Sequence, residues 1–399
     1  MAIDLIGFGI VVPLLPQFAQ RHGATPTTIG LLVASFSLAQ LVCAPVLGRL
    51  SDRVGRKPVL LMSLFGTAVG SLLTGLAGSV WMLFAGRIID GASGASVSVA
   101  QAAAADLARP DDRPRLMGLL GAAFGVGFVA GPAIGALGAL AGPPVPFLIA
   151  AALAFANAFV AIVRLPQTNP DHRDVGEHDG VAAAGADAER LAGGPALDGP
   201  GFAEPAHVLT WAPARPDRLA GDARWDVLRL VAVAFVAMVA FAGFEATFAL
   251  FGERRFGFGP SAIGAVFALV GLGLVGVQGG LVGPLIGRFG EAGALRMGLA
   301  LNLAGLLALS LDAGYPALIV GLAALVMGQG LASPALSSGV ARIAGRQRGQ
   351  WLGWQQSAGA LARVIGPASA GALFEHVSVG APFVVGAAIM AVALLLVPD

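Results

Sequence analysis

The chain has 399 residues, of which 56% are hydrophobic and only 12% are charged. Soluble domains carry roughly 25% charged residues, so this composition excludes an ordinary soluble protein and predicts an integral membrane protein. The net charge of +1 gives no indication of a nucleic-acid partner. The single cysteine, Cys43, excludes an intrachain disulfide and a cysteine metal cluster, and we expect no bound metal.

Apolar stretches of about 20 residues, the length of a transmembrane helix, recur along the whole chain. The twelve stretches have the approximate limits 1–20, 28–49, 58–78, 80–105, 115–140, 145–165, 225–252, 260–286, 293–312, 315–340, 350–375 and 379–397. A β-barrel would instead show short alternating segments. We therefore predict an all-α integral membrane fold with twelve transmembrane helices in a lipid bilayer.

The segment 166–224 separates the sixth stretch from the seventh. It is rich in Pro, Gly, Ala, Asp and Arg and has no sustained periodicity, which is typical of a flexible loop. The predicted organisation is an N-terminal six-helix bundle at 1–165, this central loop, and a C-terminal six-helix bundle at 225–399.

The two predicted bundles share sequence features at a constant offset in residue number. The first copy has Gly48, Arg53, Gly55 and Gly131-Pro132, and the second has Gly283, Arg288, Gly290 and Gly366-Pro367. Such an internal duplication predicts two pseudo-symmetric bundles with a transport pathway at their interface.

Basic residues fall mainly in alternate loops. If the N-terminus is cytoplasmic, 19 of the 24 basic residues lie in inner loops and three in outer loops. Because basic residues favour the cytoplasmic side, we predict that both termini are cytoplasmic and that the protein lies in the cell's inner membrane.

A dense basic stretch, residues 48–58, joins the second and third apolar stretches. It has the form G-x-x-x-D-R-x-G-R-K, carried by Gly48, Asp52, Arg53, Gly55, Arg56 and Lys57. Asp52 can pair with a nearby arginine or accept from a helix N-terminus, which would make an ionic latch; the alternative is a topology signal only. Position 287, the equivalent of Asp52, is glycine.

Lys57 is the only lysine in the chain. It is followed by proline, so the chain contains no Gly-Lys-Ser/Thr phosphate-binding loop for ATP. The sequence also lacks a G-x-S-x-G elbow and an HExxH pair. We predict no catalytic residues and no cofactor, and we expect an ion gradient or a partner to supply the energy.

The fifth apolar stretch carries a run of small residues with one proline: Gly127, Gly131, Pro132 and Gly135. Proline bends a helix, and glycine lets a neighbouring helix approach closely. General helix packing is the simpler interpretation of this spacing.

Ionisable residues within apolar stretches are costly, by ~2.5–3.5 kcal/mol on insertion scales, so they should face a partner or the interior. The candidates for a role in transport are Asp4, Arg87, Asp90, Glu245 and Arg363. Arg87 and Asp90 share one helix face and either neutralise each other or belong to a proton relay with Asp4. Glu245 is predicted to bind a proton or a cationic substrate rather than to snorkel, and Arg363 either binds an anionic group or forms a structural pair.

Uncharged polar residues also lie within the apolar stretches. Gln40, Gln329 and Gln355 are candidates for a substrate cavity. Hydrogen bonding between helices is an equally good interpretation for each of them.

Four of these segments resemble the major facilitator superfamily, in particular its twelve-helix drug:proton antiporters, which include tetracycline exporters. Residues 48–58 match the family's loop between helices 2 and 3, and 127–135 resemble its antiporter motif, although Ala136 replaces a frequent second glycine. Residues 4–16 and 86–94 are similar to its helices 1 and 4, although Asp90 stands where an uncharged residue is more common. The resemblance is closest over residues 3–166 and absent from the central loop.

The resemblance implies a gating role for residues 48–58 and favours export over import. We therefore expect a secondary transporter, functional as a monomer, that exports a small amphiphilic drug or metabolite by alternating access in exchange for protons. One alternative is a proton symporter that imports a sugar or other metabolite, and a more remote one is a receptor that does not transport. An enzyme is disfavoured by the lack of catalytic clusters.

Overall fold

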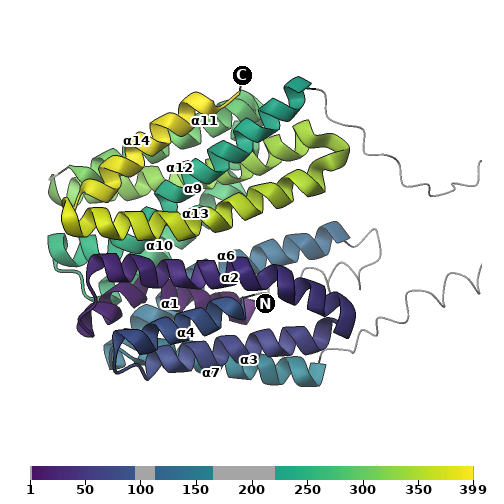
Figure 1. The fold of residues 1–399 in the computed structure, drawn as a ribbon. Coiled ribbons are helices and arrows are strands. Elements are labelled where there is room, and N and C mark those ends of the chain that lie inside the picture. The colour runs from purple at the N-terminus through teal and green to yellow at the C-terminus, as the bar shows by residue number, and fades with distance from the viewer. Residues whose placement is uncertain (1, 95–112, 165–220, 312, 399) are drawn as a thin grey trace, which may run out of the picture.

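The computed structural model describes residues 2–94, 113–164, 221–311 and 313–398 (Figure 1). These residues form twelve α-helices and one 3-10 helix, with no strand among them. The α-helices are α1 (Ala2–Arg21), α2 (Pro26–Val54), α3 (Arg56–Gly75), α4 (Val80–Ala92), α6 (Arg113–Ala141), α7 (Val145–Arg164), α9 (Gly221–Phe256), α10 (Pro260–Gly280), α11 (Val282–Ser310), α12 (Gly314–Ala344), α13 (Arg348–His376) and α14 (Ala381–Leu396), and the 3-10 helix is Gly345–Gln347.

The prediction of an all-α membrane fold is confirmed. Eight of the described helices are long and apolar enough to cross a bilayer, and two further apolar segments, Gly125–Ala141 and Ala381–Leu396, are shorter. The predicted fourth stretch beyond residue 94 and the predicted central loop up to residue 220 lie outside the described residues.

The predicted loops at 50–57 and 287–292 are wrong in detail, because both are largely helical. α2 continues to Val54 and α3 begins at Arg56, so only Gly55 lies between them. In the second half the helix runs from Val282 past a kink at Gly290. Gly55 and Gly290, which occupy equivalent positions of the repeat, have φ angles of 96° and 72°. Glycine tolerates this region without the steric cost of a side chain, so each residue turns the chain within a single position.

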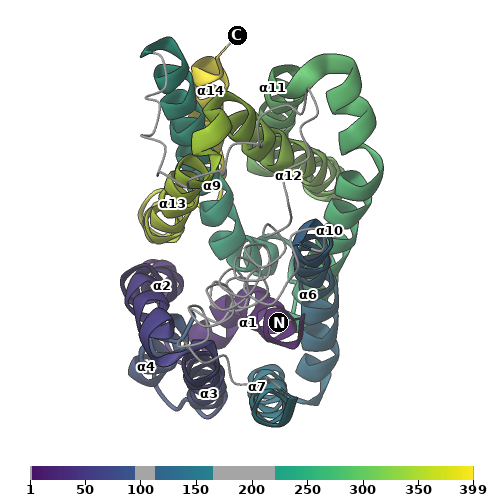
Figure 2. The ribbon, with the colours of Figure 1, turned by 90° about the vertical axis from the view of Figure 1, so that its right-hand side faces the viewer.

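Helices α1, α2, α3, α4, α6 and α7 form one bundle and α9 to α14 form the other, as Figure 2 shows. Each bundle has the same close helix crossing. A Cβ built on Gly70 of α3 would lie 2.7 Å from the carbonyl oxygen of Gly86 in α4, and one on Gly305 of α11 would lie 2.7 Å from that of Gly321 in α12. The second pair follows the first at the offset of the sequence repeat, so the sequence repeat is a structural repeat.

The two bundles meet along α2 with α13 and along α6 with α10. Several tight contacts lie toward one end of these helices, which we call the closed end. There Gly30 of α2 packs on the carbonyl of Pro367, and Gly371 packs on that of Pro26. A Cβ on Gly264 of α10 would lie 2.8 Å from the Cβ of Ala136 in α6.

Two hydrogen bonds join the bundles at the same end. The backbone N–H of Thr27, in the first turn of α2, donates to Glu375 of α13 over 2.9 Å. The Nε2 of Gln17 in α1 donates to the carbonyl of Phe258 over 2.7 Å. The closed end is therefore held by polar links as well as by glycine packing.

The opposite end of the same helices, which we call the open end, is loosely packed. A Cβ added there would meet nothing within 4 Å at Gly48, Gly276, Gly279, Gly353 and Gly359. The contacts between the bundles run from the closed end as far as Gly125 of α6, where an added Cβ would lie 3.3 Å from Val275 of α10. Figure 1 shows α2 and α13 diverging toward the open end.

Candidate functional site

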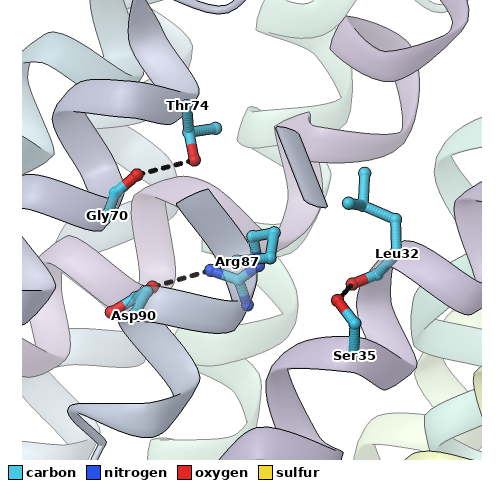
Figure 3. A network of polar contacts seen from close by, with 6 residues as sticks. All are labelled: Leu32, Ser35, Gly70, Thr74, Arg87 and Asp90. Atoms are coloured by element: carbon cyan, nitrogen blue, oxygen red, sulfur yellow. Dashed lines mark hydrogen bonds and ion pairs between the residues drawn. The ribbon is translucent and has the colours of Figure 1, made fainter. Parts of the chain in front are cut away.

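A buried ion pair lies within α4 of the first bundle (Figure 3). The Nη1 of Arg87 donates to Oδ2 of Asp90 over 2.8 Å, and the two residues are only 3% and 8% exposed. Their i,i+3 spacing places both side chains on one helix face, as the sequence predicted. Thr67 of α3 donates a further hydrogen bond to the Asp90 carboxylate.

Arg87 also contacts α2. Its guanidinium carbon lies 4.2 Å from the centroid of the Phe36 ring, a cation–π contact. Phe36 also packs against Phe8 of α1, with ring centroids 5.7 Å apart. The Nε–H of Arg87 is buried and has no hydrogen-bond partner among the described residues. The guanidinium therefore retains a donor that a second acceptor could use.

Asp4 of α1 belongs to the same cluster, because its charge acts on Asp90. The three charged groups, Asp4, Arg87 and Asp90, come from two helices that are distant in sequence. If both carboxylates are ionised, the cluster carries a net charge of −1. A single bound proton would make it neutral, and neutrality lowers the cost of burying charge in a bilayer.

The second bundle has no equivalent of the Arg87–Asp90 pair at the corresponding positions of the repeat. The equivalent positions there are Leu322 and Leu325, and a Cβ on Gly305 would contact Leu325 where one on Gly70 contacts Asp90. The duplicated framework is therefore retained while this charge pair occurs only in the first half.

A different charge pair lies in the second bundle. Glu245 of α9 is half-buried, and Arg363 of α13 is exposed. The two interact electrostatically, so the structure brings together two of the predicted residues. Phe244 and Phe248 flank Glu245 in sequence and pack on each other at 5.3 Å. Phe244 and Phe248 are buried in the core of the second bundle, whereas Phe241, one helical turn before Glu245, is half-buried.

The basic stretch 48–58 has contacts within the first bundle. The Nζ of Lys57 donates to the carbonyl of Ile162, near the end of α7, over 3.0 Å. The Nη1 of Arg56 donates to the hydroxyl of Ser51 over 2.6 Å. The Asp52 side chain lies outside the described part of the chain, so the latch assigned to it stays a prediction. Lys57 ties α3 to the C-terminal end of α7, where helix carbonyls attract a cation.

The glycines at 127, 131 and 135 form a seam between α6 and α1. A Cβ on Gly131 would lie 2.7 Å from the Cα of Gly9, and one on Gly127 would lie 2.6 Å from the Cβ of Leu5. Pro132 and Gly135 are buried beside α1 and α10. A Cβ added to Gly135 would lie 3.0 Å from the Leu14 side chain of α1. The motif thus allows close packing of α6 on the helix that carries Asp4.

Two of the three candidate glutamines bond to neighbouring helices. The Nε2 of Gln40 in α2 donates to the carbonyl of Gly94 over 2.9 Å. The Nε2 of Gln355 in α13 donates to the Ser337 hydroxyl of α12 over 3.1 Å. Gln329 is half-buried in α12. Gln40 and Gln355 therefore hold helices together, and their role in a substrate cavity stays a prediction.

Sequence reasoning missed three contributors: Phe36, Thr67 and Glu375. Phe36 and Thr67 belong to helices other than that of Arg87, so no local spacing links them to it. Glu375 stands near the end of its apolar stretch, which indicates an interfacial residue, whereas its bond to Thr27 also bridges the two halves. Pairing α2 with α13 would have been needed to find this link.

Fold and charge placement define a multi-pass membrane transporter built from two repeated six-helix bundles. The family model described as Major Facilitator Superfamily matches residues 1–311 and 256–399, which together span the chain. The protein therefore belongs to the Major Facilitator Superfamily, and it is a transporter and not an enzyme.

Relatives and solved structures agree with this assignment. The chain is 30% identical to the class C tetracycline resistance protein of Escherichia coli, over 99% of this chain and 93% of that protein. It is 25% identical to multidrug resistance protein 2 of Bacillus subtilis, over 98% and 91% of the two chains. The crystal structure of the human organic anion transporter MFSD10 (TETRAN) matches with 26% identity and a TM-score of 0.67, over 100% and 96%.

Proposed function

We propose that this transporter exports a small amphiphilic compound, drug-like or metabolic, in exchange for protons. The observation that carries the proposal is the cluster of Asp4, Arg87 and Asp90 in the first half, in which Arg87 and Asp90 are buried and Asp4 is half-buried. The cluster has one more acid than base, which provides a place for one proton. The resistance proteins among the relatives support export rather than uptake.

The cluster can link proton binding to helix movement. Asp4 lies on α1, which packs on α6 through the glycine seam, and Asp90 lies on α4, which packs on α2 through Phe36 and Gly91. α2 and α6 are the helices that meet the second bundle. A proton arriving at Asp90 would weaken its bond to Arg87 and release the guanidinium toward Asp4. This shift would alter the helices that form the bundle interface.

The second bundle would contribute substrate contacts. Glu245 is suited to a cationic group or a second proton, and Arg363 to an anionic one. Phe241, half-buried one helical turn before Glu245, would add an apolar contact for an amphiphile. Gln329 would add a neutral polar contact.

Orientation follows from the distribution of basic residues. We place the protein in the inner membrane as a monomer, with both termini and the open end in the cytoplasm. The open end would then admit substrate from the cytoplasm, and the closed end would seal the outer side. Residues 48–58 would act as the cytoplasmic gate.

The experiment compares drug susceptibility and dye accumulation in cells with and without the gene. The panel contains tetracyclines, fluoroquinolones and cationic dyes. Relative to cells without the gene, we expect lower accumulation of at least one compound with the wild-type chain but not with Asp90→Leu. Glu253→Gln, which neutralises an exposed carboxylate, is the control and is expected to behave like the wild-type chain. Gradient-driven uptake of a sugar would instead identify an importer, and binding without flux would identify a receptor.

A further inference from the structure

A groove opens on the outside of the first bundle toward the closed end. Its volume is about 640 Å³. Its walls come from α2, α4 and α13, and the principal lining residues are Leu31, Leu38, Trp81, Phe84, Val364 and Ala368. Because α13 belongs to the second bundle, the groove continues the interface between the two halves.

The groove offers almost no free polar group. Its two hydroxyl-bearing lining residues are Thr28 and Ser35. The Ser35 hydroxyl donates to the carbonyl of Leu32 over 2.7 Å (Figure 3). The Thr28 hydroxyl lies 3.1 Å from the Thr25 hydroxyl. The Thr25 hydroxyl also accepts a hydrogen bond from the backbone N–H of Thr28. With both hydroxyls bonded within α2 and its cap, the groove suits a hydrocarbon chain.

The groove also faces the bilayer. Leu31 and Leu38 are 48% and 50% exposed, and Trp81 is 81% exposed at the first turn of α4. Exposed apolar side chains of a membrane-spanning helix face lipid, and tryptophan is enriched where the bilayer meets water. A chain in this groove would therefore enter from the surrounding lipid.

A cation lies near the closed-end edge of the groove. Gly23 and Ala24 line that edge, and Arg21, two residues before Gly23, is exposed at the last turn of α1. A guanidinium recognises phosphate through paired hydrogen bonds. In a phospholipid bound here, the phosphate would lie at Arg21 and the acyl chain attached to the headgroup would extend into the apolar groove.

We propose that this groove is a phospholipid site, with one acyl chain between α2, α4 and α13 and the phosphate at Arg21. The lipid belongs to the leaflet at the closed end. Because the groove has walls from both bundles, a bound lipid stabilises the state in which the closed end is sealed. This inference goes beyond the proposed export and does not depend on the transported compound.

The test is photo-crosslinking of the full chain in nanodiscs with a phosphatidylglycerol that carries a diazirine on its acyl chain. Adducts are mapped by peptide mass spectrometry. We expect labelling at Leu31, Leu38 and Phe84 to exceed that at Ile319, a 65% exposed residue of α12 near the same end, by about fivefold, which corresponds to about 1 kcal/mol. Equal labelling at both surfaces of the wild-type protein would overturn the proposal.

Three variants and a second probe separate the groove from the headgroup contact. Ala368→Trp fills the groove and is expected to remove the enrichment. Val384→Trp, which adds the same side chain at a 51% exposed position near the start of α14, is expected to retain it. Arg21→Gln is expected to reduce the enrichment, and so is replacing the probe by a diazirine fatty acid, which has no phosphate. Unchanged enrichment with Ala368→Trp would refute the groove, and unchanged enrichment with both Arg21→Gln and the fatty acid would refute the phosphate contact.

Discussion

Arg87 and Asp90 are a charge pair that the repeat itself replaces with Leu322 and Leu325. Removing one partner of a buried pair leaves an uncompensated charge and costs about 3–5 kcal/mol, whereas replacing both by apolar residues is often neutral. We therefore expect Asp90→Leu to lower the thermal unfolding midpoint in detergent markedly. We expect the double variant Arg87→Leu/Asp90→Leu to recover wild-type stability while remaining inactive in transport.

The second bundle shows that leucines can be packed at these two positions, because Leu322 and Leu325 occupy the equivalent positions there. Stability that stays low in the double variant would show that the pair is a structural element of α4. Retained transport would show that the pair takes no part in coupling.

At the scale of helices, the glycine seam between α1 and α6 sets how closely they pack. Gly131→Ala would place a Cβ 2.7 Å from the Cα of Gly9. Overpacking of this kind costs typically about 1–3 kcal/mol, so we expect a lower unfolding midpoint. Gly276→Ala, in α10, would meet nothing within 4 Å and should leave stability unchanged or slightly raised by helix propensity. Equal effects at the two positions would contradict the seam.

The link between α2 and α13 sets the balance between states. Glu375→Gln removes a negative charge from the N-terminus of α2, an interaction worth about 0.3–1 kcal/mol. We therefore expect the fraction of molecules in which the two bundles have separated at the closed end to rise roughly two- to fivefold over the wild-type protein. Spin-label distances between Leu76→Cys and Leu311→Cys, exposed residues of opposite bundles at that end, would measure it in a Cys43→Ser background, which leaves no other thiol to label. Glu253→Gln is the matched control, and an unchanged distribution with Glu375→Gln would show that this link does not hold the closed end.

Much of the helical scaffold follows from local sequence. Apolar length predicts the spans, and the i,i+3 spacing predicts the Arg87–Asp90 pair. Contacts between helices do not follow in this way, because they depend on how helices distant in sequence pair. Phe36 over Arg87 and Glu375 on Thr27 are of this kind. The boundary at Gly55 was missed because charged residues suggested a loop, although Arg and Lys are good helix formers.

At the scale of the whole molecule, two equivalent frameworks carry different chemistry. The first bundle holds the buried Arg87–Asp90 pair with Asp4 on a neighbouring helix, and the second holds Glu245 and Arg363, whose charges influence each other. Among the described residues, the bundles contact each other from the closed end to the middle of α6 and α10. In the mechanism that we propose, opening this contact would expose the space between the bundles to the other side. Proton binding in the first bundle, together with movement of the two bundles against each other, is the mechanism that we propose for exchange of a proton against a substrate.

Proton movement in inverted membrane vesicles tests proton-coupled export most directly. With the vesicle lumen acidified by respiration and monitored by a pH-sensitive dye, a compound found in the susceptibility panel is added. We predict immediate alkalinisation of the lumen with wild-type protein and with Glu253→Gln, and none with Arg87→Leu/Asp90→Leu. Transport of the compound without any proton movement, together with intact transport by Glu245→Gln, would contradict proton-coupled export.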